Sequence, residues 1–425
     1  MAATTTIGER TTAHDPPRPL TEDEAYEHVA THALSDGGVG RVGLELESHL
    51  VDLDSPADRV PWSRACRAVA DLPALAGGSV VTLEPGGQVE LSGPPARDVA
   101  AAVEALGRDL AVVRAVLAER RLGLALLGAD PARPAQRVDP RPRYEAMERH
   151  FDATSQGGAG RAMMCSTASL QVNLDAGPRH RWSDRVARAH LLGPVLVAVT
   201  ACSPLIAGRS TGWRSTRQQV WGELDQTRCG PLGASSDPAR EWADYALCAP
   251  VMLVRDAELY GAAPVLGHVP FRAWASGDVE LGGRRPVLTD LGYHLTTLFP
   301  PTRLRGFLEV RCLDASPAWP AVAALVTALM DDERAGDLAA EACEPVAGRW
   351  TEAARDGLAD EGVARAARRC VELAASVAPS SLAGGLEALG ELVAGGRCPG
   401  DRLVDRADDV GPLAALVEQA GGNHA

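Results

Sequence analysis

The chain has 425 residues, 46% of them hydrophobic, and a formal net charge of -14. This length can bury a large core, and the acidic balance excludes a protein that coats nucleic acid, because neutralising phosphates requires an excess of basic side chains. All 42 basic residues are arginines. A P-loop lysine, a Schiff-base lysine for pyridoxal phosphate and a lysine nucleophile are therefore excluded as well.

Cysteine usage and the N-terminal segment bear on the compartment. The nine cysteines are scattered without a CxxC pair, as is typical of reduced thiols in a cytosolic protein. The first twenty residues hold no apolar core after a basic start, so we expect no secretory signal. Residues 189 to 207 are long and apolar, but Gly193, Pro194 and Pro204 favour a buried helix over a membrane span. A cytoplasmic protein without a membrane or nucleic-acid partner is predicted.

The first third of the chain alternates between helical and strand patterns. Residues 1 to 18, rich in Thr, Pro and charge, predict a disordered lead-in, and residues 19 to 425 a single domain. Thr21 and Glu24 fit a capping box that opens a helix to about residue 33. Period-two spacing predicts a strand over 40–53 and a strand-turn-strand unit over 79–91. A helix over 96–121 and a short strand over 122–127 follow.

The remainder begins with a long connection and ends in helices. Residues 129 to 160 predict a connection around one short helix at 144–150, followed by a strand over 165–175. The last strand is expected at 307–313, and helices at 318–345, 350–377, 380–395 and 403–420. The predicted fold is α+β, with a sheet-rich core over about 40–315 and a helical part over about 318–420.

The predicted strands share a polar face that is rich in glutamate. Side chains two apart on a strand point to the same face, so Glu45 and Glu47 lie opposite Leu44 and Leu46. The same alternation sets Gln171 and Asn173 on one face of their strand. Glu84 and Glu90 flank a Pro-Gly-Gly turn, and Glu309 precedes Arg311. Such faces also occur on antiparallel strands that are simply exposed to water.

If the strands form one sheet, five carboxylates would converge: Glu45, Glu47, Glu84, Glu90 and Glu309. Their mutual repulsion would raise several pKa values unless cations were bound. Oxygen ligands without a histidine cluster suit Mg²⁺ or Mn²⁺, which commonly bridge carboxylates to phosphates. The pattern suggests a site for a metal-bound nucleotide outside the P-loop class.

Several segments, in one consistent order over about residues 40 to 330, resemble the glutamate-cysteine ligase family, especially its plant-like branch. They include Gly43 to Glu47, Thr82 to Gly93, Gln171 to Asp175 and Phe307 to Arg311. Shorter matches are Arg143-Tyr144, Met163-Met164, Arg217 with Trp221, Asp244 to Leu247 and His294 to Pro300. The resemblance implies a glutamine-synthetase-like, mainly antiparallel sheet whose concave face holds ATP, Mg²⁺ and glutamate.

The resemblance also implies roles for individual residues. Glu45, Glu47, Glu84, Glu90 and Glu309 would be metal ligands, with Glu84 and Arg311 central to catalysis. Arg311 would bind the nucleotide phosphates, assisted by Gln171 and Asn173. Arg217 would bind the glutamate α-carboxylate, and Met164 and Tyr245 would lie on the substrate side, Tyr245 near cysteine.

The expected reaction is ATP-dependent joining of the glutamate γ-carboxylate to the cysteine amine, through a γ-glutamyl phosphate. The lysine-free composition is similar to that of actinobacterial proteins, whose ergothioneine pathway contains such a ligase. Four alternatives stay open: a metal hydrolase, a carboxylate-pair glycosidase, a ligase with another amine acceptor, and a noncatalytic amino-acid or nucleotide sensor. The oligomeric state also stays open.

Overall fold

The computed structural model describes residues 18–233, 235–256 and 261–421. Its centre is a seven-stranded antiparallel sheet with the order β10-β11-β5-β1-β3-β2, in which β4 also pairs with β1. The strands are β1 (Val42–Asp52), β2 (Val80–Leu83), β3 (Val89–Ser92), β4 (Leu122–Ala125), β5 (Ser169–Asp175), β10 (Thr302–Leu304) and β11 (Phe307–Asp314). The predicted lead-in falls almost wholly outside the described residues.

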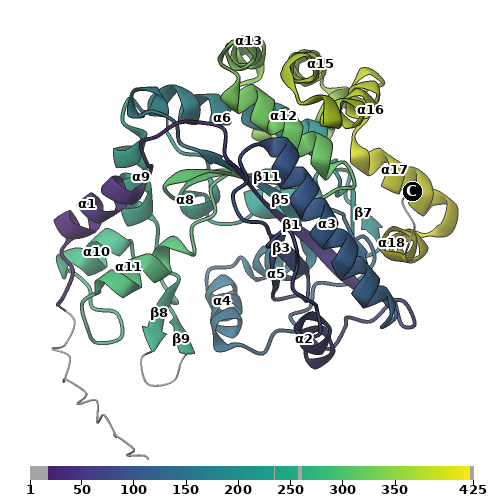
Figure 1. Cartoon of the computed structure of the whole chain (residues 1–425). Coiled ribbons are helices and arrows are strands. Elements are labelled where there is room, and N and C mark those ends of the chain that lie inside the picture. The colour runs from purple at the N-terminus through teal and green to yellow at the C-terminus, as the bar shows by residue number, and fades with distance from the viewer. Residues whose placement is uncertain (1–17, 234, 257–260, 422–425) are drawn as a thin grey trace, which may run out of the picture.

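One face of the sheet forms the main hydrophobic core. Leu44, Leu46, Val172, Leu174 and Leu308 alternate with polar residues and are fully buried. Each such side chain contributes about 1.5–3 kcal/mol on burial. Three helices pack over this face, α3 (Val99–Ala118), α6 (Trp182–Thr200) and α12 (Trp319–Asp331). In Figure 1, α6 and α12 lie above the central strands and α3 runs beside them.

The opposite, polar face is covered by a second and smaller apolar layer. It is built from α4 (Pro142–Ala153), α5 (Gly157–Ser166) and α7 (Thr216–Gly222). Met147, Phe151, Met163, Met164 and Val220 form the buried cluster of this layer. The glutamates on this face, Glu45, Glu47 and Glu90, are accordingly partly buried rather than fully exposed to water.

The prediction for residues 129 to 175 was partly wrong. A second helix, α5, occupies 157–166, so the strand begins at Ser169 rather than at residue 165. Three glycines, Gly157, Gly158 and Gly160, lower the helix propensity of its first turn. Packing against α4 requires one of them, because a Cβ on Gly160 would lie 2.3 Å from the Phe151 ring. The local helix signal was therefore weakened by a tertiary contact.

The chain beyond residue 317 is helical, but three of the expected helices are each divided in two. Asp332 caps a new helix, and Gly357 and Gly411 adopt positive φ angles of 57° and 85° that end regular helix. The C-terminal elements after α12 are α13 (Glu333–Cys343), α14 (Trp350–Asp356), α15 (Glu361–Val377), α16 (Ala383–Ala394), α17 (Pro399–Val410) and α18 (Pro412–Gly421). In Figure 1, α13, α15 and α16 lie outside α6 and α12.

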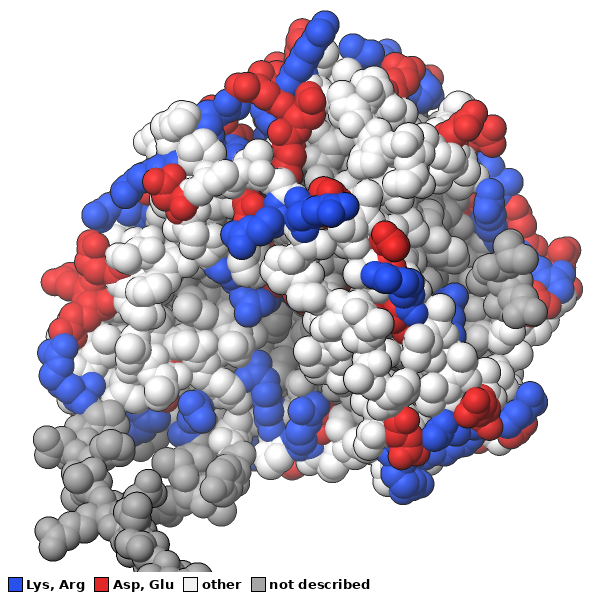
Figure 2. Space-filling model, in the orientation of Figure 1, with Lys and Arg blue, Asp and Glu red and all other residues white. Residues whose placement is uncertain are grey.

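The remaining elements surround the sheet. They are α1 (Glu22–His32), α2 (Trp62–Ala70), α8 (Gln226–Cys229), α9 (Pro238–Cys248), α10 (Phe271–Ser276), α11 (Leu288–Leu295), and the two-stranded sheets β6 (Leu205–Ile206) with β7 (Arg209–Ser210) and β8 (Leu253–Asp256) with β9 (Gly261–Pro264). The capping box at Thr21 is confirmed. Among the described residues, no helix has the length and apolar character needed to cross a bilayer. Acidic and basic side chains are interspersed on the face drawn in Figure 2.

Candidate active site

The strand register lines up the polar residues in rows across the sheet. Glu47 on β1 lies opposite Glu90 on β3, and Glu90 lies opposite Thr82 on β2. Glu45 lies opposite Gln171 on β5. A third row pairs Glu309 on β11 with both Asn173 and Arg303. These rows bring residues as distant in the sequence as Glu45 and Glu309 onto one face of the sheet.

We call the space between this face and the α4–α5–α7 layer the central cavity, which measures about 240 Å³. Its lining includes four of the five predicted metal ligands, Glu45, Glu47, Glu84 and Glu90. The predicted site residues Gln171, Arg217 and Arg311 line it as well. Met164, also a predicted site residue, lines it too. Glu309, Asn173 and Tyr245 are not among its lining residues.

Glu47 is the best connected carboxylate of the cavity. The Ser169 amide donates to its Oε2 at 2.7 Å, and the Gln171 side-chain amide donates to Oε1 at 3.4 Å. Burial raises the pKa of Glu47, opposed by the positive charges of Arg217 and Arg311. Glu47 therefore joins the carboxylate cluster to the two arginines.

Glu84 is placed by the Glu84-Pro85-Gly86-Gly87 turn between β2 and β3. The turn is closed by the Gly87 amide donating to the Glu84 carbonyl at 2.8 Å. A Cβ on Gly86 would lie 2.3 Å from the Cys165 carbonyl oxygen, so only glycine lets the turn approach α5 this closely. Close packing against α5 therefore requires the glycine of this motif, and the turn holds Glu84 at the cavity.

The carboxylates raise one another's pKa values. Burial, followed by the charge of Glu47, raises the pKa of Glu84 to about 7. Burial, followed by the charges of Glu84 and Glu47, raises the pKa of Glu90 to about 8. The Thr82 hydroxyl donates to Glu90 Oε2 at 2.7 Å, which only partly compensates. At neutral pH, and without a cation, the site therefore retains protons that a bound cation would displace.

We expect the metal-free protein to lose stability as the pH rises from about 5 to 8. A glutamate in the unfolded chain has a pKa near 4.5, whereas folded Glu90 keeps its proton up to about 8. Across that interval the folded state binds more protons, so the free energy of unfolding falls with rising pH. Thermal unfolding in EDTA at pH 6 and pH 8.5 measures this. Mg²⁺ should restore more stability at pH 8.5 than at pH 6.

Glu90→Gln tests the assignment, because the amide cannot titrate and should flatten the pH dependence. The same slope in Glu90→Gln and in the unchanged protein would contradict it. Glu104→Gln is the matched control, since Glu104 lies exposed on α3 and should leave the slope as it is.

The donor set fits a hard divalent cation. All ligand candidates are carboxylate or amide oxygens, and Gln88 Oε1 is buried in the cavity lining without a hydrogen-bond partner. Among the described residues, however, no three His, Cys, Asp or Glu side chains stand close enough to hold an ion as they are. A cation would draw the carboxylates together or complete its shell with substrate oxygens, as Mg²⁺ commonly does.

Arg217 enters the cavity from α7 and is held by the end of β11. Its Nη2 donates to the Arg311 carbonyl at 2.8 Å, while Nη1 is buried without a hydrogen-bond partner and lies 3.8 Å from Asp314. The pairing of β11 with β5 shifts register between Val310 and Leu313, which frees carbonyls from the ladder. Gln218 donates to the next one, that of Cys312, at 2.8 Å. This bulge couples the two arginines predicted to bind substrate.

Asp314 anchors the start of α7. It accepts hydrogen bonds from the Cys202 amide at 2.9 Å, the Ser203 hydroxyl at 2.6 Å and the Ser215 hydroxyl at 2.9 Å. Ser215 is the N-cap of α7, and its side chain also accepts from the Gln218 amide. The orientation of Arg217 is thus fixed by a buried network that local sequence does not indicate.

Glu309 contacts three arginines instead of the other carboxylates. Arg303 binds it through Nε and Nη2, the latter at 3.0 Å, and Arg305 and Arg311 each approach to 3.2 Å. These charges hold the pKa of Glu309 down at about 2 despite its burial. Acting as a metal ligand, as predicted, would require Glu309 to exchange at least one of these partners.

The second wall of the cavity is apolar and rich in sulfur and aromatic rings. Met147, Met163 and Met164 line it together with Tyr144, Trp221 and Phe299. The Trp221 and Phe299 rings meet edge to face at 5.3 Å. Trp221 Nε1 is buried without a hydrogen-bond partner. This sulfur-aromatic wall offers dispersion contacts to a small polarisable group and one unused donor.

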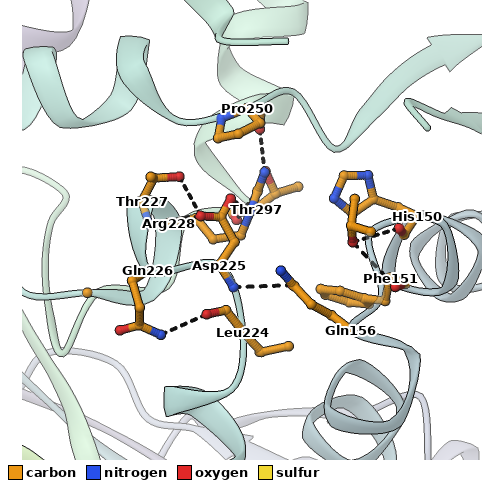
Figure 3. A network of polar contacts seen from close by, with 12 residues as sticks. His150, Phe151, Gln156, Leu224, Asp225, Gln226, Thr227, Arg228, Pro250 and Thr297 are labelled. Atoms are coloured by element: carbon orange, nitrogen blue, oxygen red, sulfur yellow. Dashed lines mark hydrogen bonds and ion pairs between the residues drawn. The ribbon is translucent and has the colours of Figure 1, made fainter. Parts of the chain in front are cut away.

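The predicted substrate residue Tyr245 and the nearby Arg228 make contacts outside the cavity lining. Tyr245 stacks on Trp242 at 5.5 Å and donates to the Gly230 carbonyl at 3.2 Å. Arg228, seven residues after Trp221, is fully buried and donates to the carbonyls of Pro250 and Thr297 (Figure 3). The Phe299 amide donates to the Arg228 carbonyl at 2.7 Å, so this network positions Phe299 in the wall.

Sequence reasoning missed Arg303 and Arg305. Both lie around β10, a strand of three residues that was not predicted. The sequence does carry a strand pattern here, because the arginines at 303 and 305 alternate with Thr302 and Leu304. The strand is too short for this alternation to stand out without its partner β11.

Comparison with known proteins decides the family. A family model described as glutamate-cysteine ligase family 2 (GCS2) matches residues 41–419. The chain belongs to glutamate-cysteine ligase family 2. The family predicted from the motifs is thereby confirmed.

Relatives support this family-2 assignment over most of the chain. The glutamate–cysteine ligase EgtA of Mycolicibacterium smegmatis is 52% identical over 404 residues, covering 94% of this chain and 95% of the relative. The EgtA of Mycobacterium tuberculosis (H37Rv) is 50% identical, covering 94% and 93%. A chloroplastic glutamate–cysteine ligase of Nicotiana tabacum is 30% identical, covering 64% and 52%.

A solved structure confirms the predicted α+β fold of this family-2 chain. It is the glutamate–cysteine ligase (gshA) from Francisella tularensis in complex with AMP. Its TM-score is 0.58 at 13% identity, and the match covers 91% of this chain and 88% of that one. At this identity the comparison bears on the fold alone.

Proposed function

We propose that this protein is an ATP-dependent glutamate–cysteine ligase that forms γ-glutamylcysteine. The observation that carries the proposal is a single cavity that joins four glutamates, Arg217 and Arg311 on one side to a sulfur-aromatic wall on the other. Membership in glutamate-cysteine ligase family 2 and about 50% identity to two EgtA ligases support it. The substrates are glutamate, cysteine and ATP.

The first half-reaction requires two anions to approach each other. The γ-carboxylate oxygen of glutamate attacks the γ-phosphorus of ATP, the bond from phosphorus to the bridging oxygen breaks, and ADP leaves with that electron pair. Arg311 is placed to neutralise phosphoryl oxygens, and Arg217, which lines the same cavity, to bind the α-carboxylate of glutamate. Positioning and charge neutralisation are the main demands of phosphoryl transfer.

Mg²⁺, with Mn²⁺ as an alternative, would be held by Glu45, Glu47, Glu84 and Glu90, with Glu309 as a further ligand after partner exchange. When bound, the cation supplies charge neutralisation at the phosphate oxygens. Glu84 and Glu90 give up their protons as it binds, and Thr82 orients Glu90.

In the second half-reaction the amine of cysteine attacks the acyl carbon of γ-glutamyl phosphate. The carbon–oxygen bond to phosphate breaks, phosphate leaves, and the amine nitrogen loses a proton. No protein nucleophile is required. We place the cysteine side chain against Met147, Met163 and Met164, which offer a polarisable surface to its thiol.

The cytoplasm supplies ATP and reduced cysteine, and we propose it as the site of action. We also propose that the product enters ergothioneine synthesis, for which the identity to the EgtA ligases is the support.

The test is turnover with purified full-length protein, ATP, Mg²⁺, glutamate and cysteine. We expect one ADP and one phosphate for each γ-glutamylcysteine, measured by coupled assay and mass spectrometry. Alanine, serine and homocysteine as acceptors test the role of the thiol. Product without ATP would indicate a hydrolase or transferase. Binding of glutamate and nucleotide without any dipeptide would indicate a sensor.

A further inference from the structure

Arg303 and Arg305 stand where three cavities meet. The first is the central cavity. The second, here the histidine cavity, measures about 470 Å³ and is lined by His28, His32, Arg303 and Arg305 among others. The third, here the glycine-rich cavity, measures about 710 Å³ and includes Gly37, Gly38, Gly43, Glu45 and Arg305. Arg303 lines the first and second, and Arg305 lines the second and third.

The charges at this junction do not balance. Glu309 carries one negative charge and is completely buried, yet it contacts three guanidinium groups, those of Arg303, Arg305 and Arg311. Arg303 alone satisfies it in a two-point contact. In the lining of the histidine cavity, every ionisable side chain is basic. Guanidinium groups therefore outnumber the one carboxylate that they contact, although Asp36, Glu45 and Asp175 also line the glycine-rich cavity.

The arginines also have donors to spare. A guanidinium has five N–H donors. Arg305 directs a single contact to Glu309, through Nη1 at 3.2 Å, and its side chain is 52% exposed. Arg303 remains 11% exposed while it lines two cavities. Arg303 uses all three side-chain nitrogens, since its Nη1 donates to the Leu298 carbonyl at 3.2 Å. Arg305 has no buried nitrogen without a partner among the described residues, so its remaining donors face accessible space.

We propose that Arg303 and Arg305 form a binding site for the polyphosphate chain of a nucleotide, and that they move from Glu309 to phosphate oxygens when it binds. This inference rests on the proposed function, because a nucleoside triphosphate is the polyanion that a ligase would bring next to Arg311. In the protein without nucleotide, the Glu309 carboxylate binds these guanidinium groups in place of phosphate and keeps them oriented. Its release makes it available to other ligands in the site.

The rival explanation is that both arginines only neutralise a buried carboxylate. The two accounts differ in what happens when Glu309 becomes neutral. If Glu309 competes with phosphate for the arginines, Glu309→Gln should raise the affinity for a metal-free polyphosphate by about tenfold. If the arginines are structural, the same change should leave that affinity unchanged or lower it.

The experiment is titration calorimetry on the full chain in EDTA with inorganic tripolyphosphate and with ADP. Arg305→Gln is the main variant, because Arg303 and Arg311 still satisfy Glu309 and the fold should persist. We expect about tenfold weaker binding of both probes and glutamate affinity within twofold of the unchanged protein. Arg349→Gln is the matched control, since Arg349 is 39% exposed and also binds a carboxylate, that of Asp360, outside these cavities.

Unchanged affinity for both probes in Arg305→Gln overturns the proposal. Equal losses of glutamate and tripolyphosphate affinity, with a lowered Tm, also overturn it in favour of a structural role. The assay for the proposed function is separate. A protein that makes no γ-glutamylcysteine, yet loses tripolyphosphate affinity in Arg305→Gln, would keep the polyphosphate site and refute the ligase.

Discussion

Replacing Glu47 with glutamine is expected to lower kcat by about two to three orders of magnitude. Glu47 links the carboxylate cluster to both cavity arginines, and its Oε2 accepts the Ser169 amide. The amide side chain has nearly the same shape and can still accept that hydrogen bond, so the main loss is charge. Without this charge, cation binding weakens and Arg217 and Arg311 lose a common counter-ion.

Steady-state turnover at saturating substrates measures this effect, with Mg²⁺ titrated up to high concentration. Partial recovery at high Mg²⁺ would indicate that Glu47 acts mainly through the cation. Glu104→Gln on the exposed side of α3 is the control and should retain full turnover. An active Glu47→Gln enzyme with ordinary Mg²⁺ dependence would refute the role assigned to this carboxylate.

Replacing Arg217 with alanine is expected to raise the KM for glutamate by about two to three orders of magnitude. Loss of a buried charge-assisted contact costs about 2–5 kcal/mol, and each 1.4 kcal/mol is a factor of about ten. The effect should fall on glutamate rather than on ATP, because Arg217 lines the cavity and is the residue predicted to bind the glutamate α-carboxylate. Arg217→Lys keeps the positive charge but removes the planar guanidinium that can bind a carboxylate through two N–H groups. An intermediate KM for glutamate is therefore expected.

Stability must be measured on the same samples, since the Asp314 carboxylate would lose the Arg217 guanidinium, which lies 3.8 Å away. Three other hydrogen bonds to Asp314 remain, so the free energy of unfolding should fall by less than the roughly 3–5 kcal/mol typical of a broken buried pair. Arg214→Ala is the matched control, because Arg214 precedes α7 and binds Asp401 instead of facing the cavity. A rise in the KM for ATP alone would assign Arg217 to the nucleotide.

The part of the site that lies on single strands and one tight turn was predictable from the sequence. Alternation at Glu45 and Glu47, and the Pro-Gly-Gly signature of the turn before Glu90, are visible in neighbouring residues of the sequence. The structure brings these carboxylates to one cavity, as predicted. Their roles as metal ligands stay predictions until the metal and pH experiments are done.

Other parts depended on contacts between distant segments. The local helix signal of α5 was weak because of its glycines, of which Gly160 accommodates the Phe151 ring. Tyr245 shares the predicted segment Asp244 to Leu247, but its ring packs on Trp242 outside the cavity lining. A family motif can therefore place a residue near the right element without determining which way its side chain points.

The sequence by itself determined which residues share a strand face, because the period of a strand is two, and it determined the family through the glutamate and glycine motifs. Only the tertiary structure decided which charges meet. Glu309 repeats the alternation of the other glutamates, yet the register of β11 with β10 and β5 surrounds it with arginines. Electrostatic energies depend on distances across strands, and those distances are set by pairing between segments far apart in the chain.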